Sequence, residues 1–372
     1  MNSATPGIER IFSWSSIDSK SRVVILVSIL LICTIPHSSG QETITGWNEA
    51  ESWTEQDLNA AVIHGELAWV FGDFGTVRFS EDSGATWQNH TNLGDVDLIS
   101  ADSYENSMAV LSAEGIIYMK DNLESDWITI DSSQTGMKSI ALTGEESLII
   151  VGNAGLIWQY TDQTWWNRTT SFTENLHDVD FNGAEDGLVV GNAGTILATD
   201  NGGITWDYRE SPDPESSIVS VSYFNPYRMF AVSDSGQIIY STSPGGFEWQ
   251  LREIESAGYN TTLATNLSSI DVVSSSRILF TGPDGYLGLS LDQGLNVERN
   301  ILPSGVNTSF NDHAMFDYVS GIVVGDSGVI LFTDRAGENE DIGFQIPDYN
   351  NFGEFVEYAD DMLLAGFIAT VK

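Results

Sequence analysis

The chain has 372 residues and carries 53 acidic against 14 basic side chains, a net charge of −39. Such a charge disfavours binding to nucleic acid or to anionic lipid surfaces, so we expect neither as a partner. The single cysteine, Cys33, excludes an intramolecular disulfide. The chain has no phosphate-binding loop, dinucleotide fingerprint or calcium loop, so we expect no cofactor and no metal.

Residues 1–40 predict a secretory signal peptide. Lys20 and Arg22 precede an apolar run from Val23 to Ile35, and a proline and small residues follow before Gln41. The run is shorter than the roughly 20 residues that span a bilayer, which favours a cleaved signal peptide. An uncleaved membrane anchor is the alternative. We expect the mature protein to be exported, in an extracellular, periplasmic or cell-surface location.

The rest of the chain repeats one unit. Seven short turns end in glycine, at spacings of 39 to 49 residues: Gly75, Gly115, Gly155, Gly194, Gly236, Gly285 and Gly328. Each turn separates two apolar runs of the kind that form a β-hairpin. A third such run lies upstream of each hairpin. In most units a tryptophan marks a fourth run downstream: Trp87, Trp127, Trp166, Trp206 and Trp249.

A four-stranded unit of about 40 residues, repeated seven times, predicts an all-β protein, a β-propeller. We expect one propeller domain over residues 41–372, closed by pairing of terminal strands. Trp47 lies 28 residues before Gly75, just as Trp87 lies 28 before Gly115, so it occupies an outermost-strand position. Residues 354–372 resemble a shortened further unit. The two ends together would complete a split blade, which favours eight blades over seven.

The segment "SEDSGATW" predicts a tight turn between the third and fourth strands of its unit. The pattern is Ser80, Asp82, Gly84, Thr86 and Trp87, and it recurs as Thr199, Asn201, Gly203, Thr205 and Trp206. It decays to Ser290-x-Asp292-x-Gly294 and to Thr242-x-Pro244-x-Gly246. An Asp or Asn side chain can bond nearby backbone N–H groups, and Gly adopts positive φ. A catalytic residue would be needed once, so these recurring residues predict a structural turn and we assign no catalytic residue.

Three further features are candidates for interaction. His177 and His313 lie among acids near inner strands, where either could hold a cation at the channel mouth, although ordinary loop residues are the simpler interpretation. The longest connection between units, Leu251–Ser268, is a candidate binding loop. Five sequons predict N-glycosylation where the cell has the machinery: Asn89, Asn167, Asn260, Asn266 and Asn307.

The segment "VVGNAGTILATDNGGITW" (Val189–Trp206) resembles the repeat of the photosystem II assembly and stability factor family. These are propellers with Asp-box, or BNR-type, repeats, a repeat shared with the sialidase-like propeller superfamily. The resemblance extends in register over the whole mature chain. It implies the propeller fold, a location outside the cytoplasm, and a role in assembling or escorting membrane complexes.

Together these features favour an exported, non-enzymatic scaffold that binds a protein or a glycan. We expect a monomer, with membrane association only through an uncleaved leader or a membrane-bound partner. The alternative is a glycan-directed, sialidase-like hydrolase with a site in the channel. A sialidase needs three convergent arginines. Arg228 and Arg277 share a register, but on the side of the Asp-box turns, opposite the usual active-site mouth.

Overall fold

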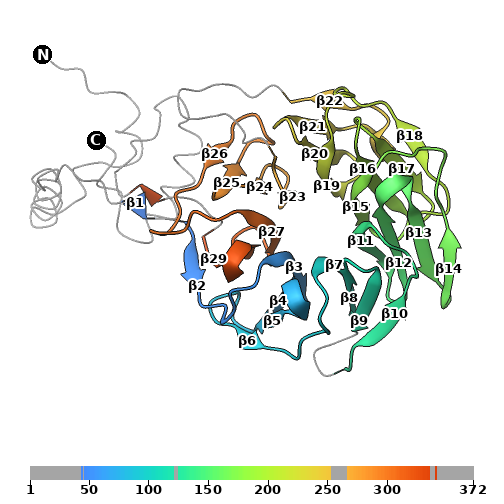
Figure 1. Ribbon diagram of the computed structural model, residues 1–372. Helices are drawn as coiled ribbons and strands as arrows, with labels where there is room; N and C mark the ends of the chain where they lie inside the picture. The colour runs from blue at the N-terminus through green and yellow to red at the C-terminus, as the bar shows by residue number, and fades with distance from the viewer. Residues whose placement is uncertain (1–42, 45, 121–124, 253–265, 336–339, 342–372) are drawn as a thin grey trace, which may run out of the picture. The chain divides into compact units, whose positions relative to one another are not determined.

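The computed structural model describes residues 43–44, 46–120, 125–252, 266–335 and 340–341, and Ile44–Glu340 forms one compact unit. Within this unit seven four-stranded antiparallel sheets are arranged as a ring around a central axis (Figure 1). The predicted all-β propeller is therefore confirmed. The predicted leader, Asn260 and the C-terminal segment 354–372 lie outside the described residues.

The blades follow one another in chain order, each with its first strand innermost. Blade 1 contains β3 (Leu58–His64), β4 (Leu67–Gly72), β5 (Val77–Ser80) and β6 (Gln88–Asn89); blade 2 contains β7 (Leu98–Tyr104), β8 (Ser107–Ser112), β9 (Ile116–Lys120) and β10 (Ile128–Asp131); blade 3 contains β11 (Met137–Gly144), β12 (Ser147–Gly152), β13 (Ile157–Thr161) and β14 (Thr164–Asn167); blade 4 contains β15 (Leu176–Asn182), β16 (Asp186–Gly191), β17 (Ile196–Asp200) and β18 (Asp207–Arg209). Blade 5 contains β19 (Ile218–Asn225), β20 (Arg228–Ser233), β21 (Ile238–Ser241) and β22 (Gln250–Leu251); blade 6 contains β23 (Ser269–Val272), β24 (Ile278–Gly282), β25 (Tyr286–Ser290) and β26 (Glu298–Arg299); blade 7 contains β27 (Phe310–Met315), β28 (Gly321–Gly325), β29 (Ile330–Thr333) and β2 (Asn48–Ala50).

The helical segments of the described part are single 3₁₀ turns: η3 (Asp73–Gly75), η4 (Asn153–Gly155), η5 (Pro244–Gly246) and η6 (Asp326–Gly328). None of the helices in this part is long and apolar enough for a membrane span. The seven glycines predicted to end the hairpin turns all have positive φ, between 63° and 82°. Glycine adopts this conformation without the steric cost that other residues bear, which explains why it recurs there.

The second strand of each blade is buried on both faces. In β8 all six residues are buried, because a blade is covered by a neighbour on either side. The core consists of separate clusters between adjacent blades. One of them joins Leu188 and Val190 of blade 4 to Met229 and Ala231 of blade 5. Stacking of blades in a closed ring thus provides the burial that a single blade lacks.

The ring closes at seven blades, so the expectation of eight is wrong. Strand β2 pairs antiparallel with β29 and becomes the outermost strand of blade 7. Trp47, beside it, is fully buried against Leu287 of blade 6 and Val323 of blade 7. The position predicted for Trp47 is therefore correct, but the strand completes the seventh unit instead of starting an eighth blade. A separate two-stranded sheet pairs β1 (Thr43–Ile44) with β30 (Glu340–Asp341).

Candidate functional site: the central channel

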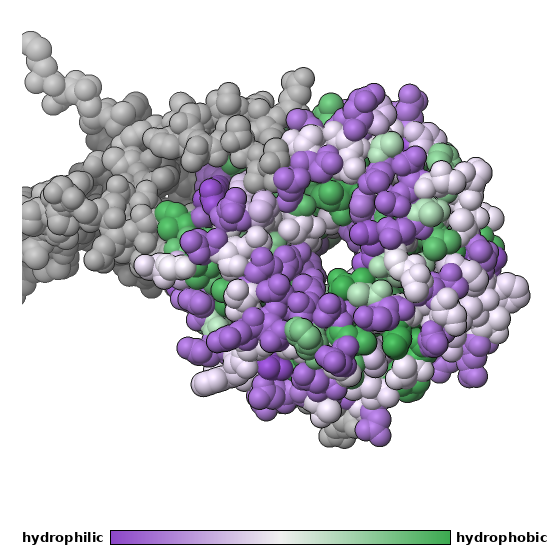
Figure 2. Space-filling view, in the orientation of Figure 1, coloured by the Kyte–Doolittle hydropathy of each residue, from purple (hydrophilic) through white to green (hydrophobic). Residues whose placement is uncertain are grey.

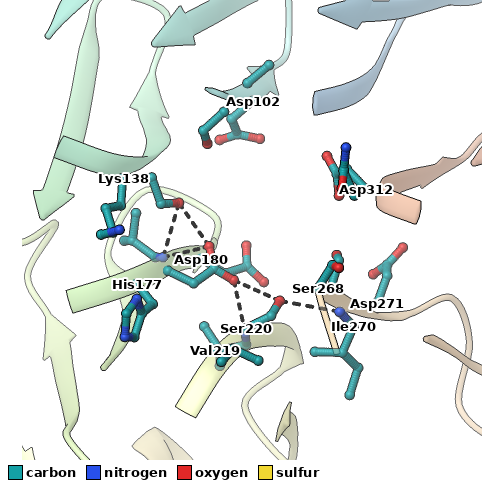
Figure 3. Close-up of a pocket in the computed structure, with 18 of the residues that line it drawn as sticks. Asp102, Lys138, His177, Asp180, Val219, Ser220, Ser268, Ile270, Asp271 and Asp312 are labelled. Carbon is teal, nitrogen blue, oxygen red and sulfur yellow. Dashed lines mark hydrogen bonds between the residues drawn. The ribbon is translucent and has the colours of Figure 1, made fainter. Parts of the chain in front are cut away.

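The inner strands enclose a cavity of about 300 Å³ on the propeller axis. Figure 2 shows an opening at the centre of the ring, with hydrophilic residues around much of it. Acidic and serine side chains line it at two levels along the inner strands: Asp102, Asp178, Asp180, Asp271 and Asp312, with Ser100, Ser139, Ser220, Ser222 and Ser269. His177, Lys138 and His313 also contribute to the lining. Figure 3 shows Asp102, Asp180, Asp271 and Asp312 around the central space.

These side chains connect neighbouring blades. An inner strand has a free edge, whose N–H groups need acceptors. Leu142 N donates to Asp102 Oδ2 at 2.7 Å, and Tyr223 N donates to Asp180 Oδ2 at 2.6 Å. The same contact recurs from Ala61 N to Asp312 Oδ2, from Ile140 N to Ser100 Oγ, from Ile270 N to Ser220 Oγ and from Val272 N to Ser222 Oγ. The channel side chains therefore act as caps for the inner edges.

Asp178 is the most highly connected of them. Its Oδ1 accepts from Ser139 Oγ of blade 3 at 2.8 Å and from its neighbour Val179 N at 2.9 Å. Its Oδ2 accepts from Ser220 Oγ at 2.9 Å and from Val221 N at 3.0 Å, both in blade 5. One carboxylate of blade 4 thus joins three successive blades.

Burial raises the pKa of all five carboxyl groups, because water is largely withdrawn from the charged form. Burial raises the pKa of Asp180 to about 8, and the neighbouring acids Asp102, Asp178 and Asp271 add to this effect. Burial likewise raises the pKa of Asp102 to about 6 and of Asp312 to about 7. The pKa values of Asp178 and Asp271 are also raised by burial, against the hydrogen bonds that they accept.

The two histidines named from the sequence have different surroundings. His177 Nε2 lies 2.5 Å from Asn192 Oδ1, and Lys138, which is exposed, lies nearby at the same level (Figure 3). His313 is buried, with Nδ1 3.5 Å from Thr281 Oγ1, and burial lowers its pKa to about 3. Within the described residues no three His, Cys, Asp or Glu side chains converge in a way that could hold a metal ion.

The predicted Asp-box residues lie in the turn between β5 and β6. Ser80 Oγ accepts from Gly84 N at 2.9 Å, and Asp82 Oδ1 accepts from Thr86 N at 2.8 Å. Trp87 Nε1 donates to Gly84 O at 2.9 Å, and the ring packs between blade 1 and blade 7. The hydrogen bonds from Thr86 and Ser80 together lower the pKa of Asp82, although burial opposes them.

The second copy repeats these contacts between β17 and β18. Thr199 Oγ1 accepts from Gly203 N, Asn201 Oδ1 accepts from Thr205 N, and Trp206 packs on Phe181 with ring centroids 6.0 Å apart. Blade 6 repeats them with Ser290, Asp292 and Gly294. In blade 5 the hydroxyls that bond are Ser241 and Ser243, so the alignment on Thr242 and Pro244 is wrong by one residue. The 3₁₀ turn η5 adds a residue there.

The other predicted residues lie apart from the channel. Arg228 and Arg277 stand at the turns that lead into β20 and β24, and Arg277 Nη1 donates to Tyr318 O. Four of the five sequon asparagines fall within the described residues, and all four are exposed: Asn89, Asn167, Asn266 and Asn307.

Sequence reasoning missed the channel carboxylates as a group. The signal was present, because alignment of the seven inner strands places Asp or Ser repeatedly at the same two positions. The sequence pointed only to the two segments in which a histidine stands among acids, around His177 and around His313. Elsewhere each position contributes one acid, and the group becomes visible only when the ring closes.

Comparison with known proteins agrees with this architecture. The family model of the photosynthesis system II assembly factor YCF48 matches residues 157–257. The chloroplastic photosystem II stability/assembly factor HCF136 of Arabidopsis thaliana is 23% identical over 277 residues, which cover 65% of this chain and 67% of that protein. The segment matched by the family model includes the Val189–Trp206 repeat.

Solved structures are similar in fold. A structure of YCF48 bound to D1 peptide has a TM-score of 0.63 at 16% identity, covering 77% of this chain and 96% of that chain. YCF48 from Cyanidioschyzon merolae has a TM-score of 0.63 at 14% identity, covering 77% and 98%. The WD40 propeller domain of Doa1 has a TM-score of 0.60 at 13% identity, covering 79% and 97%, so the fold similarity extends beyond assembly factors. The resemblance predicted from the sequence is confirmed: the chain is a seven-bladed β-propeller similar to the photosystem II assembly and stability factors.

Proposed function

We propose that this protein is an exported, non-enzymatic scaffold that binds a protein partner during assembly or stabilisation of a membrane complex. The observation that carries the proposal is the similarity to YCF48, which has been solved with a D1 peptide bound. The partner is then an exposed segment of a membrane protein. The predicted signal peptide in residues 1–40 supports export, and exposure of the described sequon asparagines is compatible with their glycosylation.

The environment of the channel acids supports binding over catalysis. Asp102, Asp180 and Asp312 each accept a main-chain N–H of the next blade, and Asp178 accepts four donors. A carboxylate that holds two blades together is poorly placed to move during a reaction. The Asp-box residues, in turn, bond one another and their own backbone, so we assign them to the turn alone.

A binding experiment tests the proposal directly. The full chain is titrated with the D1 peptide by isothermal calorimetry, and is also used as bait in a detergent-solubilised membrane fraction of the source organism. Saturable binding of the peptide, or capture of one defined membrane protein, is expected. A variant lacking residues 253–265 tests the predicted binding loop, and unchanged capture by it would reject that loop. A chain that binds neither the peptide nor a membrane protein would overturn the scaffold role.

A glycan-directed hydrolase remains the second candidate, because one observation favours it. The channel holds several carboxyl groups with raised pKa values, as a general acid requires. Burial raises the pKa of Asp102 to about 6 and that of Asp312 to about 7. Incubation with fluorogenic sialosides and other aryl glycosides tests it. Turnover by the purified chain that is lost in Asp312→Asn would establish this activity and displace the scaffold proposal.

A further inference from the structure

Two aromatic side chains stand out on the face that carries the hairpin turns. Trp53 is 69% exposed and Phe74 is 56% exposed. Both have positive φ, 57° and 54°, a conformation that bulky residues adopt at a steric cost. Trp53 lies in the connection from blade 7 to blade 1, and Phe74 lies in the hairpin turn of blade 1. Neither ring contributes to a hydrophobic core cluster.

The fold does not require aromatics at these positions. Phe74 immediately precedes the turn glycine, and the residues in that place in the other blades are Glu114, Ala154, Ala193, Ser235, Asp284 and Ser327. Trp53 corresponds to Ser133, which has φ 55° in the connection after blade 2. In both connections the next residue, Thr54 or Gln134, places its carbonyl against a turn glycine. Small or polar residues therefore serve the same backbone elsewhere in the ring.

The two segments that carry the aromatics run side by side. Asp73 N donates to Asp57 O at 2.9 Å, and Arg78 Nη2 donates to Trp53 O at 3.3 Å. Phe74 is therefore next to one of these contacts and Trp53 takes part in the other. Both residues therefore lie on neighbouring segments at the junction of blades 7 and 1, a region called the patch below.

Acidic side chains surround this patch. Asp57 Oδ1 accepts from Ser327 N, and Asp97 Oδ1 accepts from Phe74 N. Burial raises the pKa of Asp73, and the charges of Asp97, Asp57 and Asp326 raise it further, which places four carboxyls close together. Glu55 is exposed on the connection from blade 7 to blade 1, and Asp95 is exposed on the connection from blade 1 to blade 2. Arg78 is buried beneath these segments and donates to the main-chain carbonyls of Ser52 and Val77.

We propose that this patch, Trp53 and Phe74 with Asp57, Asp73, Asp97 and Asp326, is the docking surface for a basic protein segment that carries an apolar side chain. It deepens the proposed scaffold role and rests on it. Exposed aromatic rings mark interaction surfaces, and rigid aromatics supply much of the binding energy at such sites. The surrounding carboxylates select Lys and Arg and speed the encounter. They also reject acidic segments.

The experiment separates this patch from the overall negative charge of the chain. The full chain is titrated by fluorescence anisotropy with a fluorescein-labelled peptide of Lys, Arg, Leu and Gly, beside a peptide in which Glu replaces Lys and Arg. Trp53→Ser and Phe74→Ala introduce residues that other blades use at the same places, and they leave the charge unchanged. Tyr227→Ser removes an exposed aromatic from the turn between β19 and β20 and is the matched control.

We expect the basic peptide to bind and the acidic peptide not to bind. Trp53→Ser and Phe74→Ala should each raise the Kd about tenfold, with Tyr227→Ser unchanged and circular dichroism melts alike for all four proteins. Equal affinity in wild type and both aromatic variants would mean attraction by net charge alone and would overturn the docking surface. Capture of a membrane protein that persists in that case would leave the scaffold role intact. If the chain captures no membrane protein and binds no D1 peptide, the scaffold role itself fails.

Discussion

Raising the pH should destabilise the propeller through Asp180. Burial raises the pKa of Asp180 from 3.8 to about 8, and the charges of Asp102, Asp271 and Asp178, the last on the same strand, raise it further. The folded chain therefore keeps a proton that the unfolded chain releases above about pH 4. The stability that this proton provides is complete below about pH 4 and is lost as the pH rises towards about 8.

The size of the effect follows from the same values. Each pH unit between the two pKa values costs about 1.4 kcal/mol of unfolding free energy, so the interval from pH 5 to 8 sets a ceiling of about 4 kcal/mol. Solvent screening lowers the cost of the charged form, and we expect about 2 kcal/mol. Asp180→Asn retains an oxygen acceptor for Tyr223 N and removes the ionisation. The variant should therefore exceed wild type by about 2 kcal/mol at pH 9 and match it at pH 5.

Equilibrium unfolding in guanidinium chloride, followed by tryptophan fluorescence at pH 5, 7 and 9, measures these differences. Asp95→Asn, at an exposed position on the connection between blades 1 and 2, controls for the loss of one negative charge. If wild type is equally stable at pH 5 and 9, or if Asp95→Asn gains as much as Asp180→Asn at pH 9, the reasoning about channel burial is refuted.

Three other substitutions test the turns and the blade contacts. Asp178→Ala leaves Val221 N without its acceptor and should cost about 2–3 kcal/mol in denaturant unfolding, whereas Asp178→Asn should cost less than half as much; equal losses would show that charge, not hydrogen bonding, matters there. Gly84→Ala places a Cβ 2.5 Å from Ile322 Cγ2 at a residue with φ 90°, and calorimetry should show a loss of about 2 kcal/mol in unfolding free energy. An unchanged stability would mean that Ile322 of blade 7 moves to make room for the methyl group. Asp82→Ala should lower the Tm by about 2 °C at pH 7. Because the pKa of Asp82 is lowered in the folded chain, this difference should shrink as the pH falls through that pKa, and a difference that acidification leaves unchanged would contradict its origin in the carboxylate.

The repeating parts of the fold were predictable because the same physical need recurs in every unit. A hairpin needs a residue at positive φ, and glycine meets that need seven times over. A blade needs an apolar second strand, and each unit supplies one. Repetition lets weak local signals reinforce one another, so strand order and turn positions can be read from the sequence.

Closure could not be read in this way, because it depends on a single pairing between distant segments. Residues 354–372 and Trp47 both matched the repeat, and local pattern alone could not decide which of them completes the last blade. The deciding contact is the burial of Trp47 between Leu287 and Val323, which lie some 240 to 280 residues away in sequence. The channel carboxylates depend on the ring in the same way, since Asp102, Asp178, Asp180 and Asp312 each cap a strand of another blade.

In a ring of similar blades, residues shared between units and residues that break the pattern carry different information. Residues equivalent to Ser80 and Asp82 occur in blades 4 and 6 and make the same hydrogen bonds within their own turn. These residues therefore stabilise the fold. Trp53 and Phe74 occupy positions where other blades use small or polar residues, and they expose large rings at positive φ without adding to a core. A propeller that needed only to fold would gain from the smaller residues. The departure from the repeat is therefore where a partner is to be sought, and it lies on the face of the hairpin turns, away from the Asp-box turns.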